Sequence, residues 1–209
     1  MVCTLEASDL TFSYRELTLF KAADFSFSEG KVTRVAGANG AGKSTLLQII
    51  AGLQTPQRGT IELCGHSGAD SHHDELIYLG AEGNGHYRNL TARANLQLWQ
   101  DLDEIKQDVE QVLAYWGLKH RLLQTGMPVR QFSTGLKRRL ALARVHNSQR
   151  KIILLDEPSH GLDAQGILLL KEMLTNLKKQ RRIVIVVSHD AALCDVFDTT
   201  IELTRCWSH

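Results

Sequence analysis

The sequence predicts an α/β fold with a mostly parallel central sheet, a small antiparallel β subdomain and a helical lobe. Short apolar runs alternate with longer amphipathic segments, the pattern of buried parallel strands joined by helices. The first thirty residues and residues 59–63 instead alternate apolar and polar positions, as one-sided antiparallel strands do. Residues from about 85 to 145 are mainly helical in pattern. We therefore expect residues 1–209 to form one domain with this helical subdomain inserted in its core.

The first elements after the alternating strands form a strand–loop–helix unit. Residues 32–36 are an apolar run, and a glycine-rich turn separates them from apolar positions at helical spacing in residues 46–50.

Residues 101–116 place six apolar side chains on one helical face, with acidic residues in the first turn and Gly117 just past the end. This pattern predicts a single amphipathic helix.

The second half of the chain continues the alternation. The elements expected here are a basic helix over residues 136–146, a strand over 152–155, a helix with one apolar stripe over 167–177 and a strand over 183–187. No uninterrupted apolar run of the chain is longer than this last strand. Because a bilayer-spanning helix needs about 20 apolar residues, we expect no membrane-spanning segment.

The composition argues against several classes of protein. The 209 residues include 24 basic and 23 acidic ones, which gives a formal charge of +1. We expect no nucleic-acid binding, because nucleic-acid-binding domains are usually strongly basic. The N-terminus lacks the basic start and apolar stretch of a secretory signal, which predicts a cytoplasmic location. The four cysteines contain no CxxC pair and are expected to be free thiols.

Residues 37–44 read GANGAGKS and match the phosphate-loop pattern GxxxxGK[ST] between a predicted strand and a predicted helix. In such a loop, backbone N–H groups point at phosphate oxygens and the helix adds the positive end of its dipole. Lys43 is expected to contact the β and γ phosphates, and Ser44 to bind Mg2+. The nucleotide-binding residues expected in this segment are Gly37, Ala38, Asn39, Gly40, Ala41, Gly42, Lys43, Ser44 and Thr45.

Two further strands are predicted to carry polar residues to the same sheet edge. The strand at 152–155 is followed by Asp156 and Glu157, and the strand at 183–187 is followed two residues later by His189. Open parallel sheets bind ligands at the carboxyl ends of their strands. Asp156 is therefore expected to hold Mg2+ and Glu157 to deprotonate the attacking water. His189 is a candidate contact to the γ-phosphate.

These motifs together resemble the ATP-binding cassette (ABC) ATPases over nearly the whole chain. Residues 132–136, FSTGL, are similar to the family signature LSGGQ, and residues 157–163 are similar to the segment that runs from the catalytic acid into the D-loop. His189 matches the switch histidine, and Tyr14 falls where an aromatic residue stacks on adenine. The resemblance implies that ATP is the nucleotide, that Glu157 and His189 are catalytic, and that hydrolysis drives transport.

The signature segment has a physical role of its own. Ser133 can cap the helix that follows and leave free N–H groups at its start. In the family this helix end meets a nucleotide on an opposite subunit, so the resemblance implies that Ser133, Thr134 and Gly135 contact ATP across an ATP-dependent homodimer. Thr134 and Leu136 replace the usual Gly and Gln. Glu82 replaces a Gln that touches Mg2+, and it is expected to leave hydrolysis possible while changing metal dependence or basal rate.

Several motifs are similar to the ATPase subunits of cytochrome c maturation haem exporters, namely those around residues 78–80, 89–96 and 162–166. The ATPase subunit of another small-molecule or lipid exporter is an alternative, and a nucleotide-binding regulatory module without hydrolysis is another. As a transporter subunit, the chain is expected on the cytoplasmic face of the inner membrane, bound peripherally to integral membrane subunits. The expected docking residues, near residues 80–95, include Tyr87, Arg88, Leu90 and Leu98.

Overall fold

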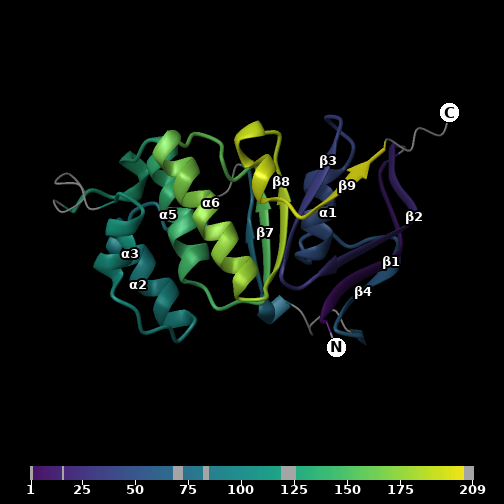
Figure 1. Ribbon diagram of the computed structural model, residues 1–209, viewed down its shortest axis with the longest axis horizontal. Helices are drawn as coiled ribbons and strands as arrows, with labels where there is room; N and C mark the ends of the chain where they lie inside the picture. The colour runs from purple at the N-terminus through teal and green to yellow at the C-terminus, as the bar shows by residue number, and fades with distance from the viewer. Residues whose placement is uncertain (1, 16, 68–72, 82–84, 119–125, 205–209) are drawn as a thin grey trace. The chain divides into compact units, whose positions relative to one another are not determined.

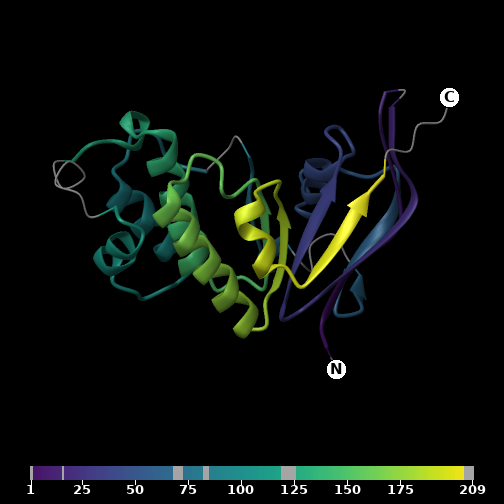
Figure 2. The ribbon, with the colours of Figure 1, turned by 45° about the horizontal axis from the view of Figure 1, so that its top comes forward.

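The computed structural model describes residues 2–15, 17–67, 73–81, 85–118 and 126–204 (Figures 1 and 2). The chain divides into two compact units. Unit 1 comprises Met1–Tyr78, Arg150–Asp156 and Leu174–His209, and unit 2 comprises Leu79–Gln149 and Glu157–Met173. Unit 1 contains almost all of the strand residues, and unit 2 contains most of the helical residues.

The antiparallel sheet has four strands in the order β2-β1-β4-β5. They are β1 (Thr4–Tyr14), β2 (Leu17–Ser28), β4 (Arg58–Leu63) and β5 (His66–Ser67). Leu5 of β1 lies opposite Phe27 on one side and Leu63 on the other, and all three side chains are buried. The next residue, Glu6, is exposed. The one-sided antiparallel strands predicted for the first thirty residues and residues 59–63 are therefore confirmed.

The central sheet has five strands in the order β6-β7-β8-β3-β9. They are β3 (Lys31–Gly37), β6 (Leu76–Leu79), β7 (Ile152–Asp156), β8 (Ile183–Val187) and β9 (Thr199–Leu203). The pairings of β7 with β8, β8 with β3 and β3 with β9 are parallel. Every residue of β7 and β8 is buried, which explains why the sequence has no polar alternation there. The predicted fold class is confirmed.

Helix α1 (Lys43–Ile50) shares one hydrophobic core with both sheets. This core includes Phe27 from β2, Leu46 and Ile50 from α1, Leu154 from β7 and Ile185 from β8. Each of these side chains is almost completely buried and contributes about 1.5–3 kcal/mol of transfer free energy. The packing holds the start of α1 at a defined position beside the ends of β7 and β8.

Unit 2 contains the helices of the segment predicted to be mainly helical, together with the start of the helix that follows β7. They are α2 (Ala92–Leu102), α3 (Val109–Tyr115), α5 (Thr134–Asn147) and the first part of α6 (Ala164–Lys179). Among the described residues, short 3-10 helices are η1 (His73–Glu75) and η3 (Ala191–Val196) in unit 1 and η2 (Val129–Gln131) in unit 2. The basic helix and the helix with one apolar stripe are confirmed as α5 and α6. Within the described ranges, no helix has the length and apolarity that crossing a membrane requires.

The prediction of one helix over residues 101–116 is wrong. Non-helical residues 103–108 separate α2 from α3. Glu104 has a φ of 54°, which helical backbone does not adopt. Asp108 then starts α3 as a new N-cap, because its side chain accepts a hydrogen bond from a backbone N–H of the first turn. Ile105 is buried inside the break, so the apolar spacing continues where the helix does not.

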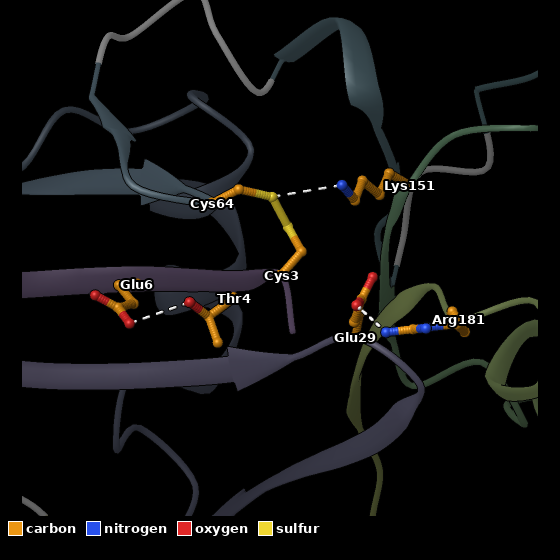
Figure 3. Close-up of a disulfide and its surroundings, with 7 residues drawn as sticks. All are labelled: Cys3, Thr4, Glu6, Glu29, Cys64, Lys151 and Arg181. Atoms are coloured by element: carbon orange, nitrogen blue, oxygen red, sulfur yellow. Dashed lines mark hydrogen bonds and ion pairs between the residues drawn. A yellow bond between two sulfur atoms is a disulfide. The ribbon is translucent and has the colours of Figure 1, made fainter. Parts of the chain in front are cut away.

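The expectation that all cysteines are free thiols is wrong for two of them. Cys3, just before β1, and Cys64, just after β4, form a disulfide within unit 1 (Figure 3). Cys194 is a free and exposed thiol. Cys206 lies outside the described residues.

Candidate functional site

The register of the central sheet brings the ends of three strands of unit 1 together. Asp156, the last residue of β7, lies opposite Val187, the last residue of β8, and Val187 lies opposite Val35 of β3. The glycine-rich loop begins two residues after Val35, and His189 follows two residues after Val187. The structure thus places the loop, Asp156 and His189 at one carboxyl edge, where parallel sheets bind ligands.

The loop between β3 and α1 ends in a helix start that no side chain caps. The N-cap of α1 is Gly42, with a φ of 96° and no side-chain hydrogen bond. A Cβ atom at this position would lie 2.9 Å from Cζ of Phe20, so both the backbone conformation and the space require glycine. The first N–H groups of α1 and the helix dipole make this end partially positive. These features fit a phosphate group.

The Lys43 side chain folds back over the loop. Its Nζ donates hydrogen bonds to the carbonyl oxygens of Gly37, at 2.8 Å, and Ala38, at 3.0 Å. The residue is 8% exposed. Because these carbonyl groups are neutral, they do not balance the positive charge of the ammonium group. A phosphate in the loop would balance that charge.

Two oxygen ligands suited to a magnesium ion lie in unit 1. Ser44 is exposed in the first turn of α1, and Asp156 is 2% exposed at the end of β7. Burial, and after it the negative charge of Asp156, raises the pKa of Tyr78 on β6. Hydroxyl and carboxylate oxygens are the ligands that Mg2+ prefers, so this donor set fits the metal. Glu82, the third expected ligand, lies outside the described residues.

Glu157, which follows Asp156 in the chain, has a strained backbone. Its φ of 47° lies in the left-handed region, which costs a residue other than glycine about 1–3 kcal/mol. Its carbonyl oxygen accepts a hydrogen bond from the backbone N–H of His160, which closes the turn. The side chain is half-buried. Left-handed residues also occur in ordinary turns of this chain, such as at Glu104, so the role of Glu157 remains the prediction made from the sequence.

The two remaining nucleotide candidates of unit 1 are partly open to solvent. His189 is exposed directly after the buried Ser188. Tyr14, at the end of β1, is 44% exposed, and its ring packs edge-on against Phe12 with 4.9 Å between the ring centroids. This contact orients the tyrosine ring and leaves much of its surface available for stacking.

The signature segment forms the start of α5 in unit 2. The Ser133 hydroxyl accepts a hydrogen bond from the backbone N–H of Leu136 at 3.3 Å, so the predicted N-cap is confirmed. Ser133 and Thr134 are exposed. A Cβ atom on Gly135 would lie 2.5 Å from the carbonyl oxygen of Gly161. The helix start therefore packs backbone to backbone against the segment that follows Glu157, and only glycine fits at position 135.

Arg139, which the sequence reasoning missed, links α5 to that same segment. Its guanidinium group donates to the carbonyl oxygen of Trp116 at 2.8 Å and forms an ion pair of 2.5 Å with Asp163. The backbone N–H of Gly166, followed by the hydrogen bond from Arg139, lowers the pKa of Asp163. Asp163 thereby joins α5 to the first turn of α6.

Arg138, also missed, holds the chain just before Glu82. It is 1% exposed and donates hydrogen bonds to the carbonyl oxygens of Gly80, at 3.2 Å, and Ala81, at 2.6 Å. The sequence does contain a signal that both arginines are buried. Residues 140–143 of α5 are all apolar, so one whole turn of this helix has no polar side. A helix buried on every side must pair its charged residues with partners from other segments.

His86 lies in a cationic and largely buried part of unit 2. Its Nε2 donates to the carbonyl oxygen of Lys137 at 2.8 Å, and its ring lies 5.6 Å from that of Trp99. Burial lowers the pKa of His86 to about 4, against the effect of this hydrogen bond, and the charges of Arg144, Lys137 and Arg138 lower it further. We infer that His86 is neutral in the folded chain at neutral pH.

This pKa predicts a loss of stability in mild acid. The folded-state pKa of His86 is lower than its ordinary value of 6.5, so the unfolded chain takes up the proton first as the pH falls. His86 therefore destabilises the fold progressively from pH 6.5 down to about 4, by about 2 kcal/mol at pH 5. Denaturant unfolding of the wild-type chain and of His86→Gln, at pH 8 and pH 5, measures the effect. The variant should lose about 2 kcal/mol less than the wild type between the two pH values, and equal losses would contradict the prediction.

The family follows from comparison with known proteins. Residues 20–160 match the family model described as "ABC transporter". The chain is 34% identical over 200 residues to the cytochrome c biogenesis ATP-binding export protein CcmA of Vibrio vulnificus, covering 91% of this chain and 94% of the relative. It is 33% identical over 192 residues to the bacitracin transport ATP-binding protein BcrA of Bacillus licheniformis, covering 90% of this chain and 62% of that protein.

A solved structure supports the same assignment. The structure described as the ATP-binding subunit of an ABC transporter superposes with a TM-score of 0.85 at 26% identity, covering 96% of this chain and 86% of the other. The fold, the family model and these identities agree, and the loop, the acidic strand end and the signature helix occur in the order expected of the family. The chain belongs to the ABC transporter family, as an ATP-hydrolysing ATP-binding subunit.

Proposed function

We propose that the chain is the ATP-hydrolysing motor subunit of an exporter for cytochrome c biogenesis, with haem as the transported molecule. The observation that carries the proposal is its 34% identity to the CcmA protein of Vibrio vulnificus, over 91% of this chain and 94% of the relative. In this proposal the whole chain acts as one ATPase domain, with residues 85–145 as its helical subdomain. The motor acts on nucleotide and on membrane subunits, and those subunits handle the haem.

In this proposal ATP binds in the phosphate loop, the residues of which are Gly37, Ala38, Asn39, Gly40, Ala41, Gly42, Lys43, Ser44 and Thr45. The ammonium group of Lys43 contacts the β and γ phosphates, and the ring of Tyr14 stacks on adenine. The carboxylate of Glu157 accepts the proton of the attacking water. The imidazole of His189 contacts the γ-phosphate. The buried position of Lys43 and the exposed ring of Tyr14 support these roles.

Mg2+ is the proposed metal cofactor, and Ser44, Asp156 and Glu82 are the residues that would hold it. The metal would neutralise part of the negative charge that develops on the phosphate groups. The first two residues supply oxygen atoms of the kind that magnesium prefers. Arg138 donates hydrogen bonds to the carbonyl oxygens of residues 80 and 81, which precede Glu82 in the sequence.

Two copies of the chain are proposed to close around two ATP molecules. Ser133, Thr134 and Gly135 of each copy would face the nucleotide of the other. The exposed N-terminal end of the fourteen-residue helix α5 supports this role, because its dipole and its N–H groups favour a negatively charged phosphate. The twofold arrangement makes the interface self-complementary.

The membrane subunits are proposed to dock on unit 2 and to hold the chain peripherally on the cytoplasmic face of the inner membrane. Tyr87 is 51% exposed and Leu90 is 37% exposed, and Arg88 between them is exposed as well. Leu98 on α2 is the fourth proposed contact. The backbone of Tyr87 is held by the buried Asn95 side chain, which accepts its N–H and donates to its carbonyl oxygen, so this surface is presented by a fixed backbone.

Affinity purification of the chain from cell membranes tests this proposal. We expect integral membrane subunits of a cytochrome c biogenesis exporter to co-purify with the wild-type chain. The double variant Tyr87→Ala/Arg88→Ala should recover at least about tenfold less of them, because loss of a central interface residue costs about 2 kcal/mol or more. Leu168→Ala, which removes another exposed apolar side chain on α6, is the matched control. Equal recovery with the double variant would contradict the docking site.

The second candidate function is that of a motor subunit for a small-molecule exporter. It is favoured by the 33% identity to the bacitracin transport ATP-binding protein over 90% of this chain. The chain covers 62% of that protein and 94% of the cytochrome c biogenesis relative, which is why the cytochrome c proposal is preferred. Co-purification of a drug-export permease in the same experiment would favour the second candidate.

A further inference from the structure

The disulfide of unit 1 joins the start of β1 to the end of β4, its antiparallel neighbour. Cys3 lies just before β1 and Cys64 just after β4, with 4.8 Å between their Cα atoms (Figure 3). The backbone N–H of Cys64 also bonds to the carbonyl oxygen of Thr4 at 2.8 Å. This Cα separation lies within the usual range of about 4.4–6.8 Å for cystine. The paired strands therefore hold both sulfurs within bonding reach without movement of the backbone.

Cys64 lies in an exposed turn. With Gly65 it forms the two-residue turn between β4 and β5, and the φ angles of the two residues are 53° and 77°. Turns with two positive φ angles favour Asn-Gly or Asp-Gly, so a cysteine at the first position is unusual. Cys64 is exposed and Cys3 is half-buried. Exposed disulfides are the labile ones, because a dissolved thiol can reach one of their sulfurs.

A lysine lies against the sulfur atom of Cys64. Nζ of Lys151, which directly precedes β7, is 3.4 Å from Sγ of Cys64 (Figure 3). The nearby carboxylate of Glu29 forms an ion pair of 2.5 Å with Arg181, so its negative charge is offset by another cation. A positive charge beside a thiol stabilises the thiolate, which is the form that attacks disulfides. Lys151 is thus placed to activate Cys64.

We propose that Cys3 and Cys64 form a reversible thiol–disulfide site, in which Cys64 exchanges with small disulfides of the glutathione type and Lys151 activates it. In the reduced chain the Cys64 thiolate attacks one sulfur of the small disulfide and releases a small thiolate, which takes up the proton lost by Cys64. Cys3 then loses its proton and attacks Sγ of Cys64, which releases the second small thiol. Two electrons pass from the cysteines to the small disulfide, and excess small thiol reverses the reaction.

The exchange changes the stability of the nucleotide-binding unit. The disulfide links residues 61 positions apart, and the chain between them includes Tyr14 and the phosphate loop. Cross-linking a loop of this length restricts the unfolded chain. The oxidised protein should therefore melt about 5–10 °C higher than the reduced protein. This redox dependence goes beyond the proposed transport function.

Thiol labelling and thermal unfolding test the site in the full chain carrying Cys194→Ser and Cys206→Ser, so that only the pair remains. After reduction both thiols should react with iodoacetamide, and after treatment with oxidised glutathione neither should. The melting temperature should rise with oxidation, and this rise should be absent when Cys3→Ser and Cys64→Ser are added. Thiols that stay reactive in excess oxidised glutathione, or an unchanged melting temperature, would overturn the proposal.

The role of Lys151 is tested in the chain whose only cysteine is Cys64. The alkylation rate rises with pH as the thiolate forms, and Lys151→Gln should move the midpoint of that rise upward by about one pH unit. Lys179→Gln, at an exposed position of α6, should leave the midpoint unchanged. An unmoved midpoint in Lys151→Gln would overturn the assignment of this lysine. ATP turnover is measured on the same proteins, so failure of the redox site and failure of the proposed ATPase are distinguished.

Discussion

ATP turnover by a Glu157→Gln variant is expected to be about 10²- to 10⁴-fold slower than that of the wild-type chain, with ATP binding retained. Glutamine keeps the length and shape of the side chain but does not accept the proton of the attacking water at neutral pH. The glutamine would occupy the same left-handed backbone conformation, with a φ of 47°. The substitution therefore removes the proton-accepting carboxylate without adding backbone strain. Phosphate release at saturating ATP, combined with a binding titration, measures both quantities.

The same variant is expected to accumulate as an ATP-bound dimer. If two copies close around ATP and hydrolysis opens them, a chain that binds ATP without hydrolysing it stays closed. Size exclusion or native mass spectrometry, with saturating ATP and the membrane partner present, measures the fraction of dimer. Glu75→Gln, which changes an exposed carboxylate in η1, should behave as the wild type. A Glu157→Gln chain that remains monomeric would contradict the dimer, and wild-type turnover would exclude Glu157 as the base.

The strands of the central sheet could be predicted because a strand that is buried on both faces consists of consecutive apolar residues. The five residues of β8 are all apolar and all buried, and the bounds predicted for this strand are those observed. The phosphate loop is equally local, since its glycines and its lysine lie within eight consecutive residues. The parallel register then places Asp156 level with the end of β8, so the gathering of these segments at one edge follows from the fold class.

The break between α2 and α3 could not be predicted from apolar spacing. Ile105 is buried although it lies between the helices, and a periodicity argument counts it as part of a helical face. The acidic residues of this stretch suggested the first turn of a helix, whereas Asp103 ends α2 as its C-cap and Asp108 caps the start of α3. Apolar spacing therefore reports which residues face the core, and the backbone conformation between them depends on local caps and turns.

The long-range polar contacts could not be predicted either. Arg138 and Arg139 look like surface residues of a basic helix, yet both are buried. Arg138 donates to carbonyl groups 58 and 57 residues away in the chain, and Arg139 donates to one 23 residues away. The disulfide joins cysteines 61 residues apart. Such pairings depend on which backbone segments the fold brings together, and no spacing pattern specifies them.

A Lys43→Met variant is expected to bind ATP about 10²- to 10³-fold more weakly than the wild-type chain and to show no measurable turnover. Methionine keeps most of the apolar stem, so the side chain can still fill the 8%-exposed position, but it removes the ammonium group. Loss of one partner from a buried pair of charges costs about 2–5 kcal/mol, and the expected change in affinity corresponds to about 3–4 kcal/mol, in the middle of that range. Calorimetric titration with ATP measures it.

The arginine variant of the same position separates charge from shape. Lys43→Arg keeps the positive charge, but its planar fork does not match the point-like ammonium group, which here donates to the carbonyl oxygens of Gly37 and Ala38. We expect its affinity to lie between those of the wild type and Lys43→Met. If both variants bound ATP as tightly as the wild type, the loop would not be the phosphate site. We expect Lys43→Met to lose ATP binding, and Glu157→Gln to keep binding and lose turnover. Lys43 would then act in binding and Glu157 in bond cleavage. A motor that hydrolyses ATP requires both steps, whereas a regulatory module without hydrolysis requires only binding.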